Sequence, residues 1–145
     1  MKILTTLIAL IVTVSWAPAE AGDYLGQYSS NPYNTNSTSN PYGPYGSPYG
    51  NGINNNYSQY GSPYSNSSAH NPYASNAPKL FDNNGKYYGR LSDNPYQSDS
   101  TSNPYGRYGS EYSPDSINNP YGAGSPYRQS SPTNPYGSGL SLFGD

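Results

Sequence analysis

The chain has 145 residues, of which 19 are tyrosine, 16 glycine and 15 proline, and it contains no cysteine. Disulfide bonds, and a lipid anchor attached through a cysteine, are therefore excluded. Six basic and eight acidic residues give a formal net charge of −2, and the basic residues are scattered among acidic ones. A nucleic-acid-binding surface needs clustered Lys and Arg, so we expect no nucleic acid partner.

Residues 1–21 have the three parts of a secretory signal peptide. Lys2 supplies the positive charge, an apolar stretch follows, and Ala19-Glu20-Ala21 provides the small residues for cleavage between Ala21 and Gly22. Ala17-Pro18-Ala19 is a second, slightly earlier candidate. The apolar stretch is shorter than the roughly twenty residues that cross a bilayer. We expect a secreted or periplasmic protein with no transmembrane span after cleavage.

Residues 22–78 form a first module, rich in Asn-Pro-Tyr and Ser-Pro-Tyr, with no Lys, Arg, Asp or Glu between Tyr24 and Pro78. Asn or Ser before Pro is held out of the α region and can fold its side chain back onto the backbone. Pro then fixes φ near about −65°, and the Gly that often follows can adopt positive φ. A backbone turned this often cannot form helices or long strands.

Residues 79–91 are predicted to form a β-hairpin. The segments Lys79–Asp82 and Lys86–Leu91 flank Asn83-Asn84-Gly85. Asn-Gly between two apolar runs is the strongest short-range hairpin signal.

Residues 79–145 form a second module that repeats the first. The segment Tyr24–Ala74 aligns with Tyr87–Gly137 at a shift of 63 residues, and 30 of about 50 aligned positions are identical. This biased composition alone would give about one identity in ten. The chain therefore descends from a duplicated unit.

The two ends of the mature chain each lack a strand partner in the sequence. Tyr24-Leu25-Gly26 corresponds to the second strand of the hairpin, but no first strand precedes it after the leader. Conversely, Leu140–Phe143 resembles Pro78–Phe81 and no strand follows it. We predict that the C-terminal strand pairs with the N-terminal one and closes the chain on itself.

The expected fold class is mostly irregular and turn-rich, with short β-hairpins, low complexity, partial disorder and a helix only in the signal peptide. Besides tyrosine, the mature part has only nine larger apolar side chains: Leu25, Ile53, Leu80, Phe81, Leu91, Ile117, Leu140, Leu142 and Phe143. That is too few for an ordinary globular core. Tyrosine is therefore expected to be the core residue, each ring lying on a proline and closing its own loop.

The segment Ser102–Gly122 reads Ser-Asn-Pro-Tyr-Gly-Arg-Tyr-Gly-Ser-Glu-Tyr-Ser-Pro-Asp-Ser-Ile-Asn-Asn-Pro-Tyr-Gly. It resembles segments repeated in small exported bacterial proteins, in which such a string commonly follows a short hairpin. The first module departs from that pattern at Gly50-Asn51-Gly52 and at Asn56. The resemblance implies a bacterial exported protein of the envelope or periplasm, and it brings no activity with it.

The residues that catalysis or metal binding would need are sparse. The single histidine, His70, aligns with Thr133 in the other module, so we interpret it as an exposed imidazole. Asp82-Asn83-Asn84-Gly85 fits a hairpin turn better than a calcium loop, whose ligands alternate along the chain. We expect no enzymatic activity, no catalytic residue, no cofactor and no metal site.

We therefore expect an exported structural or interaction protein whose partner the sequence does not identify. The candidate interaction surface lies in the second module, at Tyr105, Tyr108, Tyr112, Tyr121 and Tyr127. Exposed tyrosine also stacks on sugar faces, so a glycan- or peptidoglycan-binding envelope module is the alternative. Self-association through stacked or oxidatively cross-linked tyrosines is a further possibility.

Overall fold

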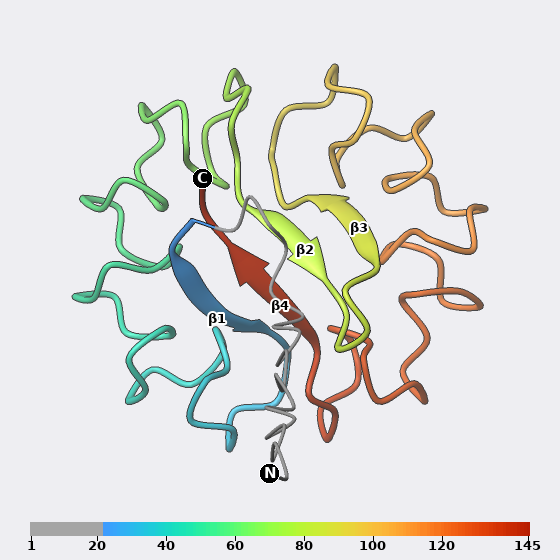
Figure 1. Cartoon of the computed structure of the whole chain (residues 1–145), viewed down its shortest axis with the longest axis horizontal. Helices are drawn as coiled ribbons and strands as arrows, with labels where there is room; N and C mark the ends of the chain where they lie inside the picture. Colours follow the sequence, from blue (N-terminus) through green and yellow to red (C-terminus); the bar gives the residue numbers. More distant parts are fainter. Residues whose placement is uncertain (1–21) are drawn as a thin grey trace, which may run out of the picture.

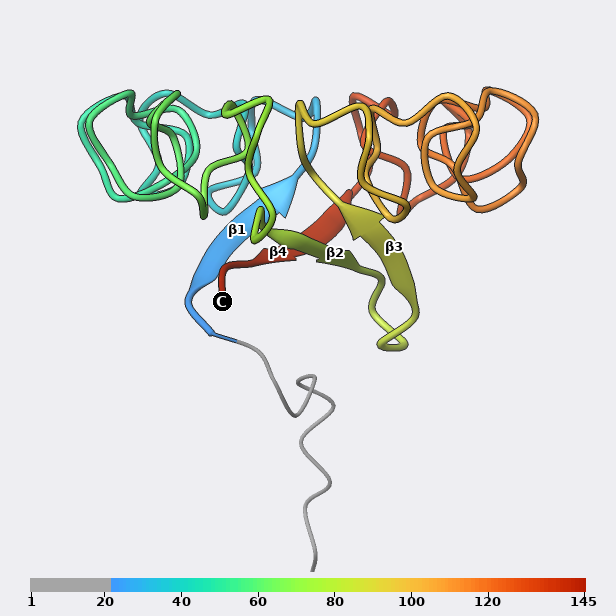
Figure 2. The ribbon, with the colours of Figure 1, turned by 90° about the horizontal axis from the view of Figure 1, so that it is seen from above.

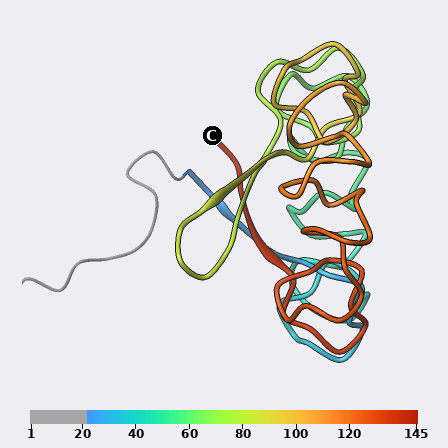
Figure 3. The ribbon, with the colours of Figure 1, turned by 90° about the vertical axis from the view of Figure 1, so that its right-hand side faces the viewer.

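A computed structural model describes residues 22–145, which form a layer of short turns around a small β-sheet. The four strands are β1 (Tyr24–Tyr28), β2 (Lys79–Phe81), β3 (Tyr87–Arg90) and β4 (Leu140–Phe143). Figure 1 shows the turns of the first module on one side of the sheet and those of the second on the other. In Figures 2 and 3 the turns of both modules lie in one layer, and the sheet lies on one side of it with the β2–β3 turn projecting away.

The turn-rich fold class and the hairpin are confirmed. Strands β2 and β3 pair in antiparallel fashion, with Lys79 opposite Arg90 and Phe81 opposite Tyr87. At the turn, Gly85 has a φ of 80°, the left-handed conformation that only glycine adopts without strain. No helix occurs in residues 22–145.

The predicted closure of the chain is also confirmed. Strand β4 pairs antiparallel with β1, placing Tyr24 opposite Phe143 and Tyr28 opposite Leu140. The same strand pairs on its other edge with β2, so the sheet order is β1-β4-β2-β3. The strand that the first module lacks is therefore supplied by the last residues of the chain.

The two modules are related by an approximate two-fold axis through the centre of the sheet. In the β2–β4 pair Leu80 faces Leu142, and these residues are equivalent in the repeat. Gly26 and Gly89, 63 positions apart, have φ values of 93° and 91°. Each is followed by an isolated parallel bridge, Gln27 with Ser37 in one module and Arg90 with Ser100 in the other.

The core lies where the sheet meets the turn layer. Its buried members are Leu25, Ile53, Tyr60, Ala69, Leu80, Tyr88, Ala123, Leu140 and Leu142, with Tyr28, Leu91 and Ile117 packed against them. Phe81 and Phe143 contact each other at the sheet surface, with ring centroids 6.0 Å apart. The few large apolar residues of the chain are thus gathered at one place.

The turn layer is filled by small side chains. Its fully buried serines are Ser37, Ser68, Ser92, Ser100, Ser116 and Ser131. In each, the hydroxyl oxygen accepts a hydrogen bond from the backbone N–H two residues later, as in Ser100 with Ser102 (3.1 Å). Because these hydroxyls are satisfied, burying them carries little penalty. Packing of the turns therefore needs few apolar atoms.

The expectation that the glycine after Pro-Tyr adopts a positive φ is wrong. The positive φ values in residues 22–145 occur at Gly26, Gly85, Gly89 and Gly139, and none of these follows a Pro-Tyr pair. At Gly106 an added Cβ would lie 2.7 Å from the carbonyl oxygen of Ser98. Glycine is required there because neighbouring turns approach too closely for a side chain.

Two further expectations concern order and export. The composition suggested a partly disordered chain, whereas residues 22–145 adopt one continuous arrangement of hydrogen-bonded turns. The signal peptide expected at residues 1–21, including Ala21 at the cleavage site, lies outside the described residues. Gly22 is described, and it lies against the backbone of Gly144 and Asp145.

Candidate functional site

Each Asn-Pro-Tyr segment builds a turn in which the asparagine side chain makes two bonds. In Asn103-Pro104-Tyr105-Gly106, the Asn103 Oδ1 accepts the Tyr105 N–H at 3.0 Å, and the Asn103 carbonyl accepts the Gly106 N–H at 3.1 Å. The Asn103 Nδ2 donates to the carbonyl of Gln97 at 3.2 Å, in the preceding turn. One amide thus closes its own turn and ties it to the one before.

The same three bonds are made by six asparagines of the described residues, namely Asn40, Asn55, Asn71, Asn103, Asn119 and Asn134. Asn31 and Asn94 instead donate across the modules, Asn31 to the carbonyl of Gly137 and Asn94 to that of Ala74. At Ser47, Ser62, Ser110 and Ser125 the hydroxyl oxygen accepts the N–H of the tyrosine two residues later, at 3.2–3.3 Å. In these segments asparagine therefore links turns, whereas these four serines close only their own turns.

This turn geometry directs the third residue of each turn, the tyrosine, into solvent. Twelve tyrosines are 82–98% exposed: Tyr33, Tyr42, Tyr49, Tyr57, Tyr64, Tyr73, Tyr96, Tyr105, Tyr112, Tyr121, Tyr127 and Tyr136. We call these twelve the tyrosine surface. Six lie in each module at equivalent positions of the repeat. The prediction that tyrosine rings form the core is therefore wrong for these twelve.

The remaining seven tyrosines are buried or half-buried. Tyr60 and Tyr88 are 1% and 3% exposed. The hydroxyls of Tyr60 and Tyr87 each donate to an aspartate, Asp23 and Asp99 respectively, at 2.7 Å. Burial and the carboxylate of Asp23 together raise the pKa of Tyr60 to about 12. Rings such as those of Tyr60 and Tyr87, whose hydroxyls are bonded to aspartates, hold the fold together.

Four of the five tyrosines singled out in the sequence belong to the tyrosine surface: Tyr105, Tyr112, Tyr121 and Tyr127. The fifth, Tyr108, packs edge-on against the Tyr87 ring with centroids 5.3 Å apart, and its face carries the Arg107 guanidinium. Its counterpart Tyr45 packs in the same way on Tyr24. The eight further exposed tyrosines were missed, although an Asn or Ser two residues earlier marks each of them.

Two grooves of the tyrosine surface lie between pairs of exposed rings. Tyr57 and Tyr64 line one of about 460 Å³, together with Pro63 and His70. Tyr112 and Tyr121 line another of about 470 Å³, together with Glu111, Asn119 and Pro120. Hydrogen bonding to Glu111 raises the pKa of the Tyr112 hydroxyl. Both grooves present aromatic walls with hydrogen-bonding groups at their edges.

Charged residues brace the second module. Asp115 binds Lys86, at the hairpin, and Arg107, each at 2.7 Å, and hydrogen bonds from these two cations hold the pKa of Asp115 below its usual range. Arg90 lies 3.4 Å from carboxylate oxygens of both Asp99 and Asp145. The pairs with Asp115 and Asp99 attach the hairpin to the turn layer, and the Arg90–Asp145 pair ties it to the C-terminal end of the chain.

Residues of the kind that hold metals or perform catalysis are not clustered in the described part of the chain. Within residues 22–145 no group of three or more His, Asp and Glu side chains is placed to hold a metal ion. His70 lies 3.7 Å from Asp93, and both side chains are about half exposed. Asp82 caps the hairpin turn, where its Oδ1 accepts the N–H groups of Asn84 and Lys86.

Comparisons of the chain with protein-family models, with curated proteins and with solved structures found no match. Over residues 22–145, no helix is long and apolar enough to cross a membrane. The function must therefore be argued from the geometry of the tyrosine surface.

Proposed function

We propose that this is an exported, non-enzymatic interaction protein that binds its partner through the tyrosine surface. The observation that carries the proposal is the set of twelve tyrosines, 82–98% exposed and six to a module. Large aromatic side chains exposed in this number favour an interaction surface. The turns that carry the rings are closed by hydrogen bonds to an asparagine or serine side chain, so little backbone conformational entropy is lost when a partner binds.

The chemistry of the tyrosine surface indicates how a partner would be recognised. Tyrosine offers an apolar ring face and one hydroxyl, which suit stacking and hydrogen bonding. The first module has no Lys, Arg, Asp or Glu from Tyr24 to Pro78, so six of the twelve rings lie on an uncharged segment. Binding should therefore depend weakly on salt, because salt screens charges and not stacking.

A cell-envelope glycan is the partner that the two grooves favour. The walls of these grooves are pairs of exposed phenol rings, Tyr57 with Tyr64 and Tyr112 with Tyr121. A sugar ring has apolar faces that stack on aromatic rings and hydroxyls that bond to polar groups at the groove edges. Repeated grooves on one layer would engage a polymer at several points, and such multivalency increases the overall affinity.

The test is retention of the mature protein on purified peptidoglycan at low and high salt. A groove variant carries Tyr→Ala at Tyr57, Tyr64, Tyr112 and Tyr121, and a matched control carries it at Tyr33, Tyr42, Tyr96 and Tyr105. Retention that is independent of salt and lost only in the groove variant would support glycan binding in the grooves. Loss in both variants would assign the binding to the whole tyrosine surface.

Failure of the wild-type protein to be retained would reject the glycan partner. The broader proposal then depends on self-association, measured by sedimentation velocity over a concentration series. A wild-type protein that neither binds peptidoglycan nor associates with itself, with the groove variant behaving identically, would contradict an interaction role for these tyrosines.

A further inference from the structure

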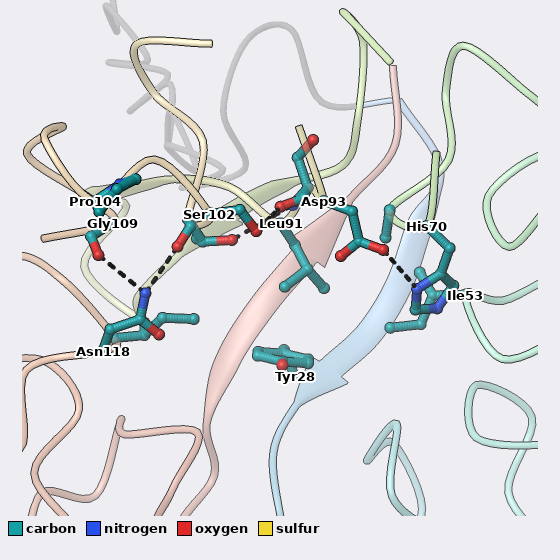
Figure 4. Close-up of a pocket in the computed structure, with 13 residues that line it drawn as sticks. Tyr28, Ile53, His70, Leu91, Asp93, Ser102, Pro104, Gly109 and Asn118 are labelled. Carbon is teal, nitrogen blue, oxygen red and sulfur yellow. Dashed lines mark hydrogen bonds and ion pairs between the residues drawn. The ribbon is translucent and has the colours of Figure 1, made fainter. Parts of the chain in front are cut away.

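Another hollow, which shares His70 with the Tyr57–Tyr64 groove, is lined by residues of both modules. It measures about 460 Å³, which is within the usual range for a small-molecule site. Its apolar lining comes in pairs that the repeat makes equivalent: Tyr28 with Leu91 and Ile53 with Ile117. Figure 4 shows Tyr28 and Leu91 in the middle of this central pocket, with Ile53 and His70 on one side and Asn118 on the other.

The polar lining of the central pocket breaks the two-fold symmetry. His70 and Asp93 line it, 3.7 Å apart, while the equivalent positions hold Thr133 and Ser30, which do not. The Thr133 hydroxyl instead donates to the carbonyl of Gly124 at 2.6 Å. The pocket therefore carries a single carboxylate at one side of an apolar lining, and this arrangement would orient an asymmetric ligand.

Asp93 is available to accept a hydrogen bond in this pocket. Its backbone N–H is fixed by the carbonyl of Ala69 at 3.0 Å, and its carboxylate is about half exposed. The charge of Asp93 also reaches the Tyr28 hydroxyl, where it adds to burial in raising the pKa of that phenol. Because no Lys or Arg lines the pocket, an anionic ligand would be repelled, whereas a neutral donor would be accepted.

The chain itself shows which neutral donor suits an aspartate beside apolar side chains. The Tyr60 hydroxyl donates to Asp23 and the Tyr87 hydroxyl donates to Asp99, both at 2.7 Å. In both cases a phenol ring packs among apolar or aromatic groups while its hydroxyl meets a carboxylate. The central pocket offers the same two elements, an apolar lining and Asp93, and the Tyr28 phenol that lines it makes no hydrogen bond to that carboxylate.

We propose that the central pocket binds a neutral para-substituted phenol, with its ring against Ile53, Leu91 and Ile117 and its hydroxyl donating to Asp93. The phenol could be a free small molecule or a tyrosyl side chain of a second copy, which displays twelve of them. The proposal does not depend on the glycan-binding role of the tyrosine surface.

The single histidine gives a readout of binding, because His70 lines the central pocket and the chain contains no other His. His70 also lines the Tyr57–Tyr64 groove, so the variants described below are needed to assign a shift to the pocket. The experiment titrates the mature protein with p-cresol and follows the imidazole signals of His70 by NMR. We expect saturable shifts with p-cresol and at least about tenfold weaker binding of 4-methylanisole, which has the same ring but no hydroxyl proton. Equal binding of the two compounds, or no saturable shift with p-cresol, would overturn the proposal.

Variants of the chain distinguish p-cresol binding in the central pocket from binding elsewhere on the surface. Asp93→Ala should weaken p-cresol binding about tenfold or more, and Ser30→Ala, at the equivalent position outside the pocket, should leave it unchanged. Ile117→Trp, which fills the pocket, should abolish the shifts while the far-UV circular dichroism stays that of the wild type. Unchanged p-cresol affinity in both Asp93→Ala and Ile117→Trp would show that the phenol binds elsewhere.

The source of the phenol is distinguished by sedimentation velocity. If it is a tyrosyl of a second copy, the wild-type protein self-associates, and both p-cresol and Asp93→Ala reduce that association. If the protein stays monomeric while p-cresol binds, the pocket takes a free phenol. Both results presuppose that p-cresol binds, so they identify only the source of the phenol. A protein that does not bind p-cresol still overturns the proposal.

Discussion

Leu80 and Leu142 face each other across β2 and β4, and both side chains are fully buried. They are equivalent residues of the repeat, so the approximate two-fold axis passes through their contact. Strand β4 lies between β1 and β2 and thereby joins the beginning of the chain to its middle. The contact therefore links the two modules, and a defect there should affect both.

Truncation of this contact should destabilise the whole protein. We expect Leu142→Ala to lower the free energy of unfolding by about 2–5 kcal/mol, because it removes buried methyl groups and leaves a cavity. Urea unfolding followed by circular dichroism measures the change, with the exposed Gln59→Ala as control. Leu80→Ala should behave alike. Unfolding of both variants should remain a single transition. Separate unfolding of one module would contradict the coupling through β4.

The hairpin and the closure of the chain could be predicted because they depend on local signals. Asn84-Gly85 between apolar runs specifies a tight turn, and the repeat alignment shows that the first module lacks one strand. Both signals survive in a low-complexity chain, because neither requires knowledge of how distant turns pack. The pairing of Tyr24 with Phe143 follows from them directly.

The positions of the tyrosine rings could not be predicted in the same way. The expectation that tyrosine forms the core rests on the idea that apolar area must be buried. In the structure, the third position of the turn directs the tyrosine ring outward, as at Tyr105. The interior is filled instead by hydrogen-bonded serines such as Ser100 and by close backbone contacts at glycine. The central pocket was equally hidden, because residues from both modules meet there.

The linking role of asparagine can be tested at Asn103. We expect Asn103→Asp to cost about 1–3 kcal/mol, because the carboxylate keeps the turn acceptor but cannot donate to the Gln97 carbonyl. The exposed Asn56→Asp provides a matched control of equal charge change. Urea unfolding compares the two variants, and equal stabilities would show that the bond between turns contributes nothing.

The close approach of neighbouring turns predicts that alanine destabilises the protein more at Gly109 than at Gly50. An alanine Cβ at Gly109 would lie 2.1 Å from the carbonyl oxygen of Asn103, so the backbone would have to move. We expect Gly109→Ala to cost about 1–3 kcal/mol. Gly50→Ala should be tolerated better, since the equivalent position in the second module is Ser113. Thermal unfolding of both variants checks this order, and the reverse order would refute the packing argument.

Ionisation of the internal tyrosines should unfold the protein at alkaline pH. The pKa of Tyr60 is raised to about 12 in the folded state, by burial and by Asp23, from an ordinary value near 10. A group whose pKa rises on folding stabilises the protein fully below its unfolded pKa. That contribution is lost as the pH passes from about 10 to about 12. Burial and Asp99 raise the pKa of Tyr87 in the same direction.

The measurement is urea unfolding at intervals from pH 8 to pH 12. The wild-type free energy of unfolding should fall above pH 10, and Tyr60→Phe should make this fall shallower, because Phe has no proton to lose. Tyr42→Phe, at a ring that is 98% exposed, is the matched control and should follow the wild-type curve. If Tyr60→Phe also follows that curve, the Tyr60–Asp23 bond does not govern alkaline stability, and the fall must come from Tyr87 or other groups.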